Sequence, residues 1–144
     1  MPSMAREEEV NCMEQLAEEL LKELEKLPVL DAHTHVDAGH LSARGLHDVL
    51  LYHMLATELY SAGCPDGARL SEEPDEAEAE ARMTRALPYL PYVQNTSCFW
   101  MAKTILRDLY DWNEPVTQDN WRILDARIRE KSKDPAWPRE ILRR

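Results

Sequence analysis

Apolar residues recur at three- and four-residue steps over residues 5–27, and this spacing predicts an amphipathic helix. The stripe consists of Met13, Leu16, Leu20, Leu24 and Leu27, and glutamate fills most of the opposite face. Pro28 ends the pattern, because proline lacks the amide hydrogen that a helix interior requires. We therefore expect an N-terminal amphipathic helix over 1–27.

The apolar run that follows, over 29–36, predicts a β-strand with two histidines near its end. His33 and His35 are two residues apart, so on a strand both side chains point to the same face. Neutral imidazole is a good ligand for zinc and neighbouring metals, which makes this pair a candidate metal site. Asp31 shares the face by parity, and it could orient an imidazole or make a plain hydrogen bond at the strand entry.

Helical patterns cover most of the remaining chain, from 46 to 144. The stretch 46–61 is apolar nearly all round, which is typical of a buried helix. Pro74 fits the first residue of an acidic helix that runs to about Leu87, after which Pro88 and Pro91 break the chain.

Three more helices are predicted nearer the C-terminus. One covers 96–110, with Phe99, Leu106 and Leu109 among the residues of one apolar stripe. Thr117 can cap the next, in which Trp121, Leu124 and Ile128 share a face. The last begins near 134–135.

The predicted fold class is mostly α with a single core β-strand. A lone strand cannot satisfy its own backbone groups, so we expect part of the fold to lie outside this sequence.

The composition narrows the classes of function. The chain has 144 residues and a formal charge of −10, which argues against general nucleic-acid binding and against docking on anionic membranes. No apolar run approaches the roughly 20 residues that span a bilayer, and the acidic N-terminus is unlike a signal peptide. Three cysteines far apart fit no closed disulfide set, so free thiols in a reducing, cytoplasmic setting are expected.

The apolar strand ending in His-x-His resembles the first barrel strand of the amidohydrolase superfamily, whose members are metal-dependent (β/α)8 TIM barrels. Three later segments resemble the uronate isomerase (glucuronate isomerase) branch: Leu-His-Asp-Val-Leu-Leu-Tyr-His-Met at 46–54, Glu-Leu-Tyr-Ser-Ala-Gly-Cys-Pro at 58–65, and Leu-Pro-Tyr-Leu-Pro-Tyr-Val-Gln-Asn-Thr at 87–96. That branch inserts a mostly helical segment after the first strand. The resemblance implies an N-terminal barrel fragment in which 28–45 holds the strand and metal-ligand loop and 46–144 the helical insertion.

The resemblance implies roles for three histidines. His33 and His35 match two metal ligands, for a divalent ion expected to be zinc, and His53 matches a histidine near the sugar substrate. Some members carry an aromatic residue after that histidine, where this chain has Met54. The family's other ligands, an aspartate and carboxylate-binding arginines, come from later strands, which by this resemblance lie beyond Arg144.

The implied reaction is aldose–ketose isomerisation of a hexuronate, of the D-glucuronate to D-fructuronate type, although the isolated chain is expected to be inactive. A metal-dependent hydrolase of the same superfamily and a non-enzymatic helical interaction module remain alternatives. The expected partner is a small-molecule sugar acid, and a homo-oligomer is left open.

Other candidate residues have ordinary structural explanations. His40 and His47 fit loop and helix-surface positions, and Arg107 and Arg122 fit solvated helix surfaces. Packing is the expected role of the four tryptophans, Trp100, Trp112, Trp121 and Trp137.

Overall fold

The structure is a computed structural model of the 144-residue chain, and it describes residues 4–28, 39–65 and 75–143. The chain divides into two compact units, residues 1–36 and residues 37–144.

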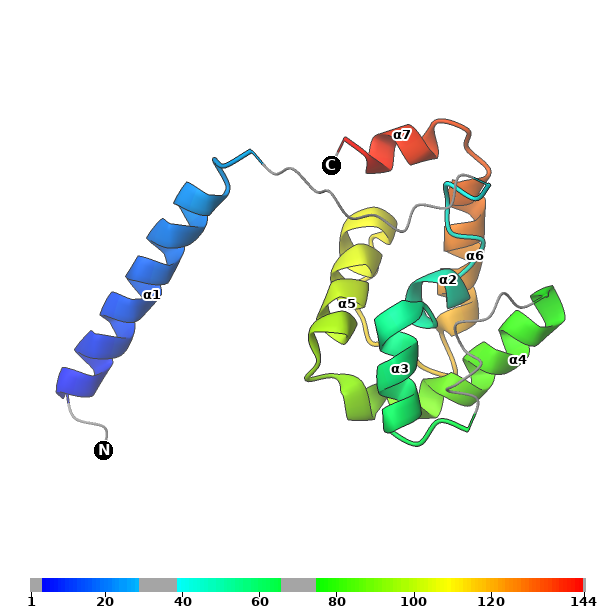
Figure 1. Cartoon of the computed structure of the whole chain (residues 1–144), viewed down its shortest axis with the longest axis horizontal. Coiled ribbons are helices and arrows are strands. Elements are labelled where there is room, and N and C mark those ends of the chain that lie inside the picture. Colours follow the sequence, from blue (N-terminus) through cyan, green and yellow to red (C-terminus); the bar gives the residue numbers. More distant parts are fainter. Residues whose placement is uncertain (1–3, 29–38, 66–74, 144) are drawn as a thin grey trace. The chain divides into compact units, whose positions relative to one another are not determined.

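The first unit contains helix α1, Met4–Leu24, drawn in blue in Figure 1. The helix matches the predicted amphipathic segment, and it ends four residues before Pro28. Its apolar stripe is exposed: Leu16, Leu20 and Leu24 each keep more than half of their surface accessible.

The second unit is built from short helices that follow one another closely (Figure 1). They are α2 (His47–Leu50), α3 (His53–Ser61), α4 (Glu76–Ala86), the 3-10 helix η2 (Leu87–Val93), α5 (Ser97–Tyr110), α6 (Trp121–Ser132) and α7 (Trp137–Ile141).

The expected fold class is wrong. Residues 4–28, 39–65 and 75–143 contain helices and no β-strand, so the described core is made by helices alone rather than around a strand. The strand itself was expected over 29–36, which lies outside the described residues. The physical reason is that the apolar faces of the second unit's helices cover one another, so this core closes without a sheet.

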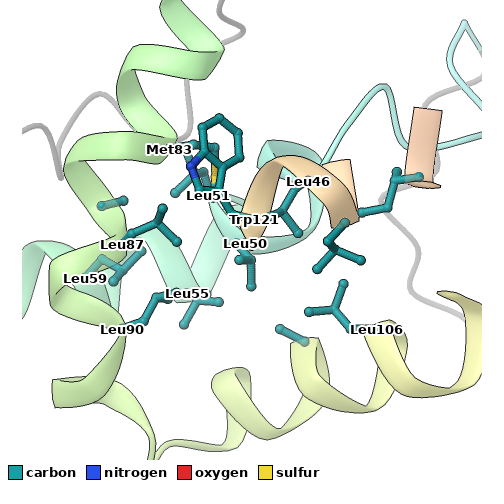
Figure 2. Packing of buried hydrophobic residues seen from close by; sticks show 14 of the residues in the cluster. Leu46, Leu50, Leu51, Leu55, Leu59, Met83, Leu87, Leu90, Leu106 and Trp121 are labelled. Carbon is teal, nitrogen blue, oxygen red and sulfur yellow. The ribbon is translucent and has the colours of Figure 1, made fainter. Parts of the chain in front are cut away.

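The middle of the second unit is formed by α2 and α3. Helix α2 contacts α4 and α5, helix α3 contacts η2 and α5, and α5 contacts α6. Figure 2 shows the buried side chains that meet there from several helices, including Leu50, Leu55, Leu106 and Trp121. Burial of such apolar surface is the main favourable term in folding.

The stretch 46–61, predicted as one buried helix, is two helices. The break lies at Leu51 and Tyr52, where Tyr52 is extended with φ −92° and ψ 135°. The buried positions Leu50 and Leu55 face the core on either side of it, whereas Met54 and Tyr52 are exposed. An apolar composition all round therefore did not mean burial all round.

Helix starts follow side-chain caps in two cases. The Asp75 side chain accepts a hydrogen bond from the Glu78 amide at 2.8 Å at the start of α4. The Thr96 hydroxyl accepts one from the Phe99 amide at 3.2 Å at the start of α5. Such caps satisfy amides that have no partner within the helix.

Two local predictions need correction. Pro88 and Pro91 do not simply interrupt the chain, since they lie within the 3-10 helix η2. Thr117 is not the cap of α6: that helix begins after Asn120, whose side-chain oxygen accepts from the Thr117 amide at 2.8 Å.

Among the described residues, none of the helices combines the length and apolar character needed to cross a membrane.

Candidate functional site

The predicted metal ligands His33 and His35, together with Asp31, fall within 29–38 and lie outside the described residues. His53 is the first residue of α3, and its side chain also lies outside the described part. The residues on either side of it, Tyr52 and Met54, are exposed. The structure therefore places the start of α3 at a surface position of the second unit.

His47, predicted on a helix surface, is instead buried, with 8 % of its surface exposed. It is the first residue of α2, and Leu46 and Leu50 beside it belong to the core. A buried polar side chain requires hydrogen-bonding partners. The Nε2 atom of His47 lies 3.2 Å from Oδ1 of Asp48.

His47 and five residues near it form what we call the His47 cluster, which consists of Arg44, Gly45, His47, Asp48, Asp125 and Arg129. Asp48 accepts hydrogen bonds from Arg44 through the backbone amide at 2.7 Å, Nε at 3.0 Å and Nη2 at 2.9 Å. These three hydrogen bonds fix the residues that lead into α2.

The cluster also joins α2 to α6. Asp125, on α6, accepts a hydrogen bond from the Leu46 amide at 2.7 Å through Oδ1 and one from Arg129 Nε at 2.7 Å through Oδ2. The Ser132 hydroxyl, near the end of α6, donates to the Ala43 carbonyl at 2.5 Å. Two contacts from α6 therefore hold the segment 43–46.

Gly45 lies where the cluster is tightest. A Cβ atom at this position would come within 2.6 Å of Oδ1 of Asp125 and 3.0 Å of Nδ1 of His47. Only glycine allows the backbone to approach these two side chains so closely.

The electrostatics of the cluster favour an ionised Asp48. Burial of this carboxyl raises its pKa, but the hydrogen bonds from His47 and Arg44 outweigh burial and hold the pKa well below its usual range. Burial raises the pKa of Tyr110, and the charge of Asp48 in the cluster raises it further.

His47 lines a cavity of about 320 Å³ that also reaches α4 and α6. Two arginines and two carboxylates line it as well, and they are paired: Arg122 Nη2 lies 2.6 Å from Glu80 Oε1, and Arg129 Nε lies 2.7 Å from Asp125 Oδ2. An imidazole beside a carboxylate is suited to proton transfer. The remaining contacts of the cluster hold α2 and its preceding segment against α6.

Arg107 is exposed and paired with Asp108 at 2.6 Å, and Arg122 is exposed and paired with Glu80, so both fit solvated helix surfaces as predicted. The tryptophans at 112, 121 and 137 are buried as expected, whereas Trp100 is 64 % exposed and is not a core residue.

Sequence reasoning missed the His47 cluster. A signal was present in the two ion pairs at helical spacing, Arg44 with Asp48 and Asp125 with Arg129. The sequence pattern alone did not place Asp125 near Leu46, because that contact spans 79 positions in the chain.

No group of three or more histidine, cysteine, aspartate or glutamate side chains suited to a metal ion occurs in the described part of the chain. The three cysteines, Cys12, Cys64 and Cys98, form no disulfide with one another. Comparison with protein-family models, with curated proteins and with solved structures found no match to this chain.

Proposed function

We propose that the chain is part of a uronate isomerase-like enzyme that interconverts a hexuronate aldose and its ketose, of the D-glucuronate to D-fructuronate type. The observation that carries the proposal is the order of features along the chain. The motif His33-Thr34-His35 is followed by a unit, 37–144, whose described residues are helical. A His-x-His motif followed by a mostly helical segment is the arrangement that the family resemblance implies.

His33 and His35 would hold a divalent metal ion, with zinc the expected species. Imidazole nitrogens suit zinc in kind, and two of them leave room for further ligands. When bound, the ion would act as a Lewis acid that polarises substrate oxygens. On this proposal the remaining protein ligands lie beyond Arg144.

His53 is proposed to contact the substrate and to take part in moving the proton. In the isomerisation, a proton leaves C2 and is delivered to C1, while the aldehyde oxygen becomes a hydroxyl and the C2 hydroxyl becomes a carbonyl. A histidine is suited to this step because it exchanges protons near neutral pH. It is the first residue of α3, and its sequence neighbours Tyr52 and Met54 are exposed.

We do not propose that Arg107 or Arg122 binds the uronate carboxylate. Both are exposed, and each already pairs with a neighbouring carboxylate, Asp108 or Glu80. A bidentate arginine elsewhere in the enzyme would serve this role.

Metal binding tests the ligand assignment on the 144-residue chain. Titration calorimetry with Zn²⁺ should show weak binding that is lost in His33→Ala and in His35→Ala. The matched control is His40→Ala, which removes an exposed histidine five residues from His35 and should leave binding unchanged. A tightly held stoichiometric ion that survives His33→Ala would contradict the assignment.

Activity is tested separately. The 144-residue chain should not convert D-glucuronate, and measurable turnover by it would contradict the proposal that further ligands are needed. The polypeptide encoded by the complete reading frame should form D-fructuronate, detected by NMR, and His33→Ala or His53→Ala should reduce the rate. A complete polypeptide that cleaves a substrate bond with water, and does not isomerise uronates, would favour the hydrolase instead.

A further inference from the structure

Helix α1 of the first unit carries a row of large apolar side chains that remain exposed. Six of them are each between 54 % and 68 % exposed: Met13, Leu16, Leu20, Leu21, Leu24 and Leu27. Single apolar residues on a surface are ordinary, whereas a contiguous row of them marks an interaction surface. We therefore examine which partner the geometry of this row fits.

The spacing within the row is that of a coiled coil. Steps of four and three residues alternate along what we call the α1 seam: Met13, Ala17, Leu20, Leu24 and Leu27. This alternation repeats every seven residues and keeps the side chains along one side of a helix. A second helix with the same spacing can pack against such a seam, each side chain fitting between those of the other helix.

The helical path extends to the last residue of the α1 seam. Beyond the end of α1, the Glu25 amide donates to the Leu21 carbonyl at 2.9 Å, and the Leu27 amide donates to the Leu24 carbonyl at 3.0 Å. At a rise of about 1.5 Å per residue, the seam is about 21 Å long. It therefore lies on one continuous helical stretch of the first unit (Figure 1).

Two further leucines indicate that the fitting helix is a second copy of α1. In the seven-residue repeat, Leu16 and Leu21 occupy the positions that flank the seam, one on each side. They are five residues apart, and in a parallel pair of helices the flanking residues with this separation lie beside one another. Leu16 of each copy would thus meet Leu21 of the other copy, so an identical helix covers the flanking leucines as well as the seam.

The charge of α1 opposes this association and makes it dependent on salt. The helix contains seven glutamates and two basic residues. Glu14 and Glu23 occupy the same flanking positions as the two leucines, so two copies bring negative charges close together. Salt screens repulsion between exposed charges and leaves the apolar contacts in place. Association should therefore be stronger at high salt, whereas binding to a basic partner would be weaker.

We propose that α1 is a self-association surface, through which two copies of the chain form a parallel coiled-coil dimer along the α1 seam. The inference is independent of the proposed isomerase activity, since it uses neither the metal ligands nor His53. The seam is short, so the interface is near the lower limit of about 1,000 Å² for specific interfaces, and a dissociation constant on the order of 100 µM is expected.

Sedimentation equilibrium of the reduced 144-residue chain tests the association. The mass should rise with protein concentration from the 16.7 kDa of one chain toward twice that value. Raising the salt concentration from about 0.05 M to about 0.5 M should tighten the dimer by about five-fold. A chain that stays monomeric at both salt concentrations up to about 1 mM would overturn the proposal.

Two variants of equal charge separate the seam from the rest of α1. Leu20→Glu places a carboxylate in the seam and should weaken the dimer by about ten-fold or more. Gln15→Glu adds the same charge at an exposed position on the outer side of the helix and should leave the affinity within about two-fold. Glutamate and leucine are both good helix formers, so neither change disfavours α1 itself.

The near-ultraviolet circular dichroism of the tryptophans serves as a folding control for both variants. All four tryptophans lie in the second unit, so an unchanged spectrum shows that this unit is still folded. Equal dimerisation of Leu20→Glu and the native chain would overturn the proposal. So would a monomeric native chain whose stability falls in Leu20→Glu, because the row would then pack within its own chain.

Disulfide formation tests the parallel orientation. In a Cys12→Ser background, Met13→Cys places two cysteines opposite one another across the seam of a parallel dimer, and mild oxidation should link the chains. In an antiparallel pair these residues would lie near opposite ends of the seam. Lys22→Cys, on the outer side of the helix, is the control and should link far less. Equal linkage through residues 13 and 22, or none through residue 13, would overturn the parallel dimer.

Discussion

Residues around Gly45 pack so closely that adding one methyl group at this position would force neighbouring atoms to move. The Gly45→Ala variant would bring its Cβ within 2.6 Å of Oδ1 of Asp125. We expect the variant to lower the free energy of unfolding by about 1–3 kcal/mol, because overpacking forces side chains or backbone to move. Urea unfolding followed by circular dichroism measures this loss.

The matching control is a double-mutant cycle with Asp125→Ala. If the contact with Asp125 causes the loss at Gly45, the alanine at 45 should cost much less when Asp125 is already absent. Equal costs in both backgrounds would contradict the steric explanation.

Asp48 gives the chain a specific dependence of stability on pH. Its pKa in the folded chain lies below the usual value of 3.8, so its interactions with Arg44 and His47 stabilise the fold above that value. The contribution is lost as pH falls through the folded pKa. Asp48→Asn should therefore lower the free energy of unfolding by about 2 kcal/mol near neutral pH.

The difference between the native chain and Asp48→Asn should narrow as the pH is lowered from about 5 to about 2. Urea unfolding at several pH values measures it. Asp119→Asn, at an exposed aspartate, is the control and should show little difference at any pH. A constant gap between the native chain and Asp48→Asn across this range would contradict the assignment of the effect to the Asp48 carboxylate.

Among the elements, the C-terminal end of α5 depends on side chains from α6. Arg127 Nη1 donates to the Tyr110 carbonyl at 3.0 Å and to the Asp111 carbonyl at 3.1 Å, and Lys131 Nζ donates to the Leu109 carbonyl. These carbonyls have no partner within the helix, and cations are favourable at a helix C-terminus. The two helices are thus joined by charge as well as by apolar packing.

Arg127→Ala should lower the free energy of unfolding by about 1 kcal/mol, because it leaves two of these carbonyls without their donor. Arg122→Ala, on the same helix, removes an ion pair with Glu80 whose two side chains are 60 % and 58 % exposed, and it should change stability by less than about 0.5 kcal/mol. Thermal unfolding of the two variants tests the contrast. A larger loss for Arg122→Ala would contradict it.

Elements with a clear apolar stripe could be predicted from the sequence. The helix expected over 96–110 is found at Ser97–Tyr110, and the shared face of Trp121, Leu124 and Ile128 is buried in α6. The regular spacing of these side chains can be read from neighbouring residues alone, so it is enough to predict the helix and its buried face.

The predictions that failed concern features that depend on contacts between residues far apart in the sequence. The break at Tyr52 and the burial of His47 come from packing of α2 and α3 against other helices, which no local pattern records. Likewise the link from Leu46 to Asp125 is a tertiary contact. The proposed metal ligands His33 and His35 stay predictions, since they lie outside the described residues.

For the whole molecule, the excess of acidic over basic side chains determines the pH range in which protein molecules repel one another. The formal charge is −10 at pH 7, and the isoelectric point is about 4.9. Solubility should therefore be lowest near pH 4.9 and should rise on either side, because a net charge keeps protein molecules apart. Light scattering across a pH series measures this. A minimum well above pH 6 would contradict charge as the controlling term.

The uneven burial of the four tryptophans gives the folded chain two populations of fluorophore. Trp100 is 64 % exposed, whereas Trp112, Trp121 and Trp137 are each 6 % exposed or less. A water-soluble quencher such as acrylamide should thus quench the emission of Trp100 more strongly than that of the other three tryptophans while the chain is native, and all four similarly once it unfolds. Removing Trp100 as Trp100→Phe would leave a protein whose remaining fluorescence reports the opening of its interior.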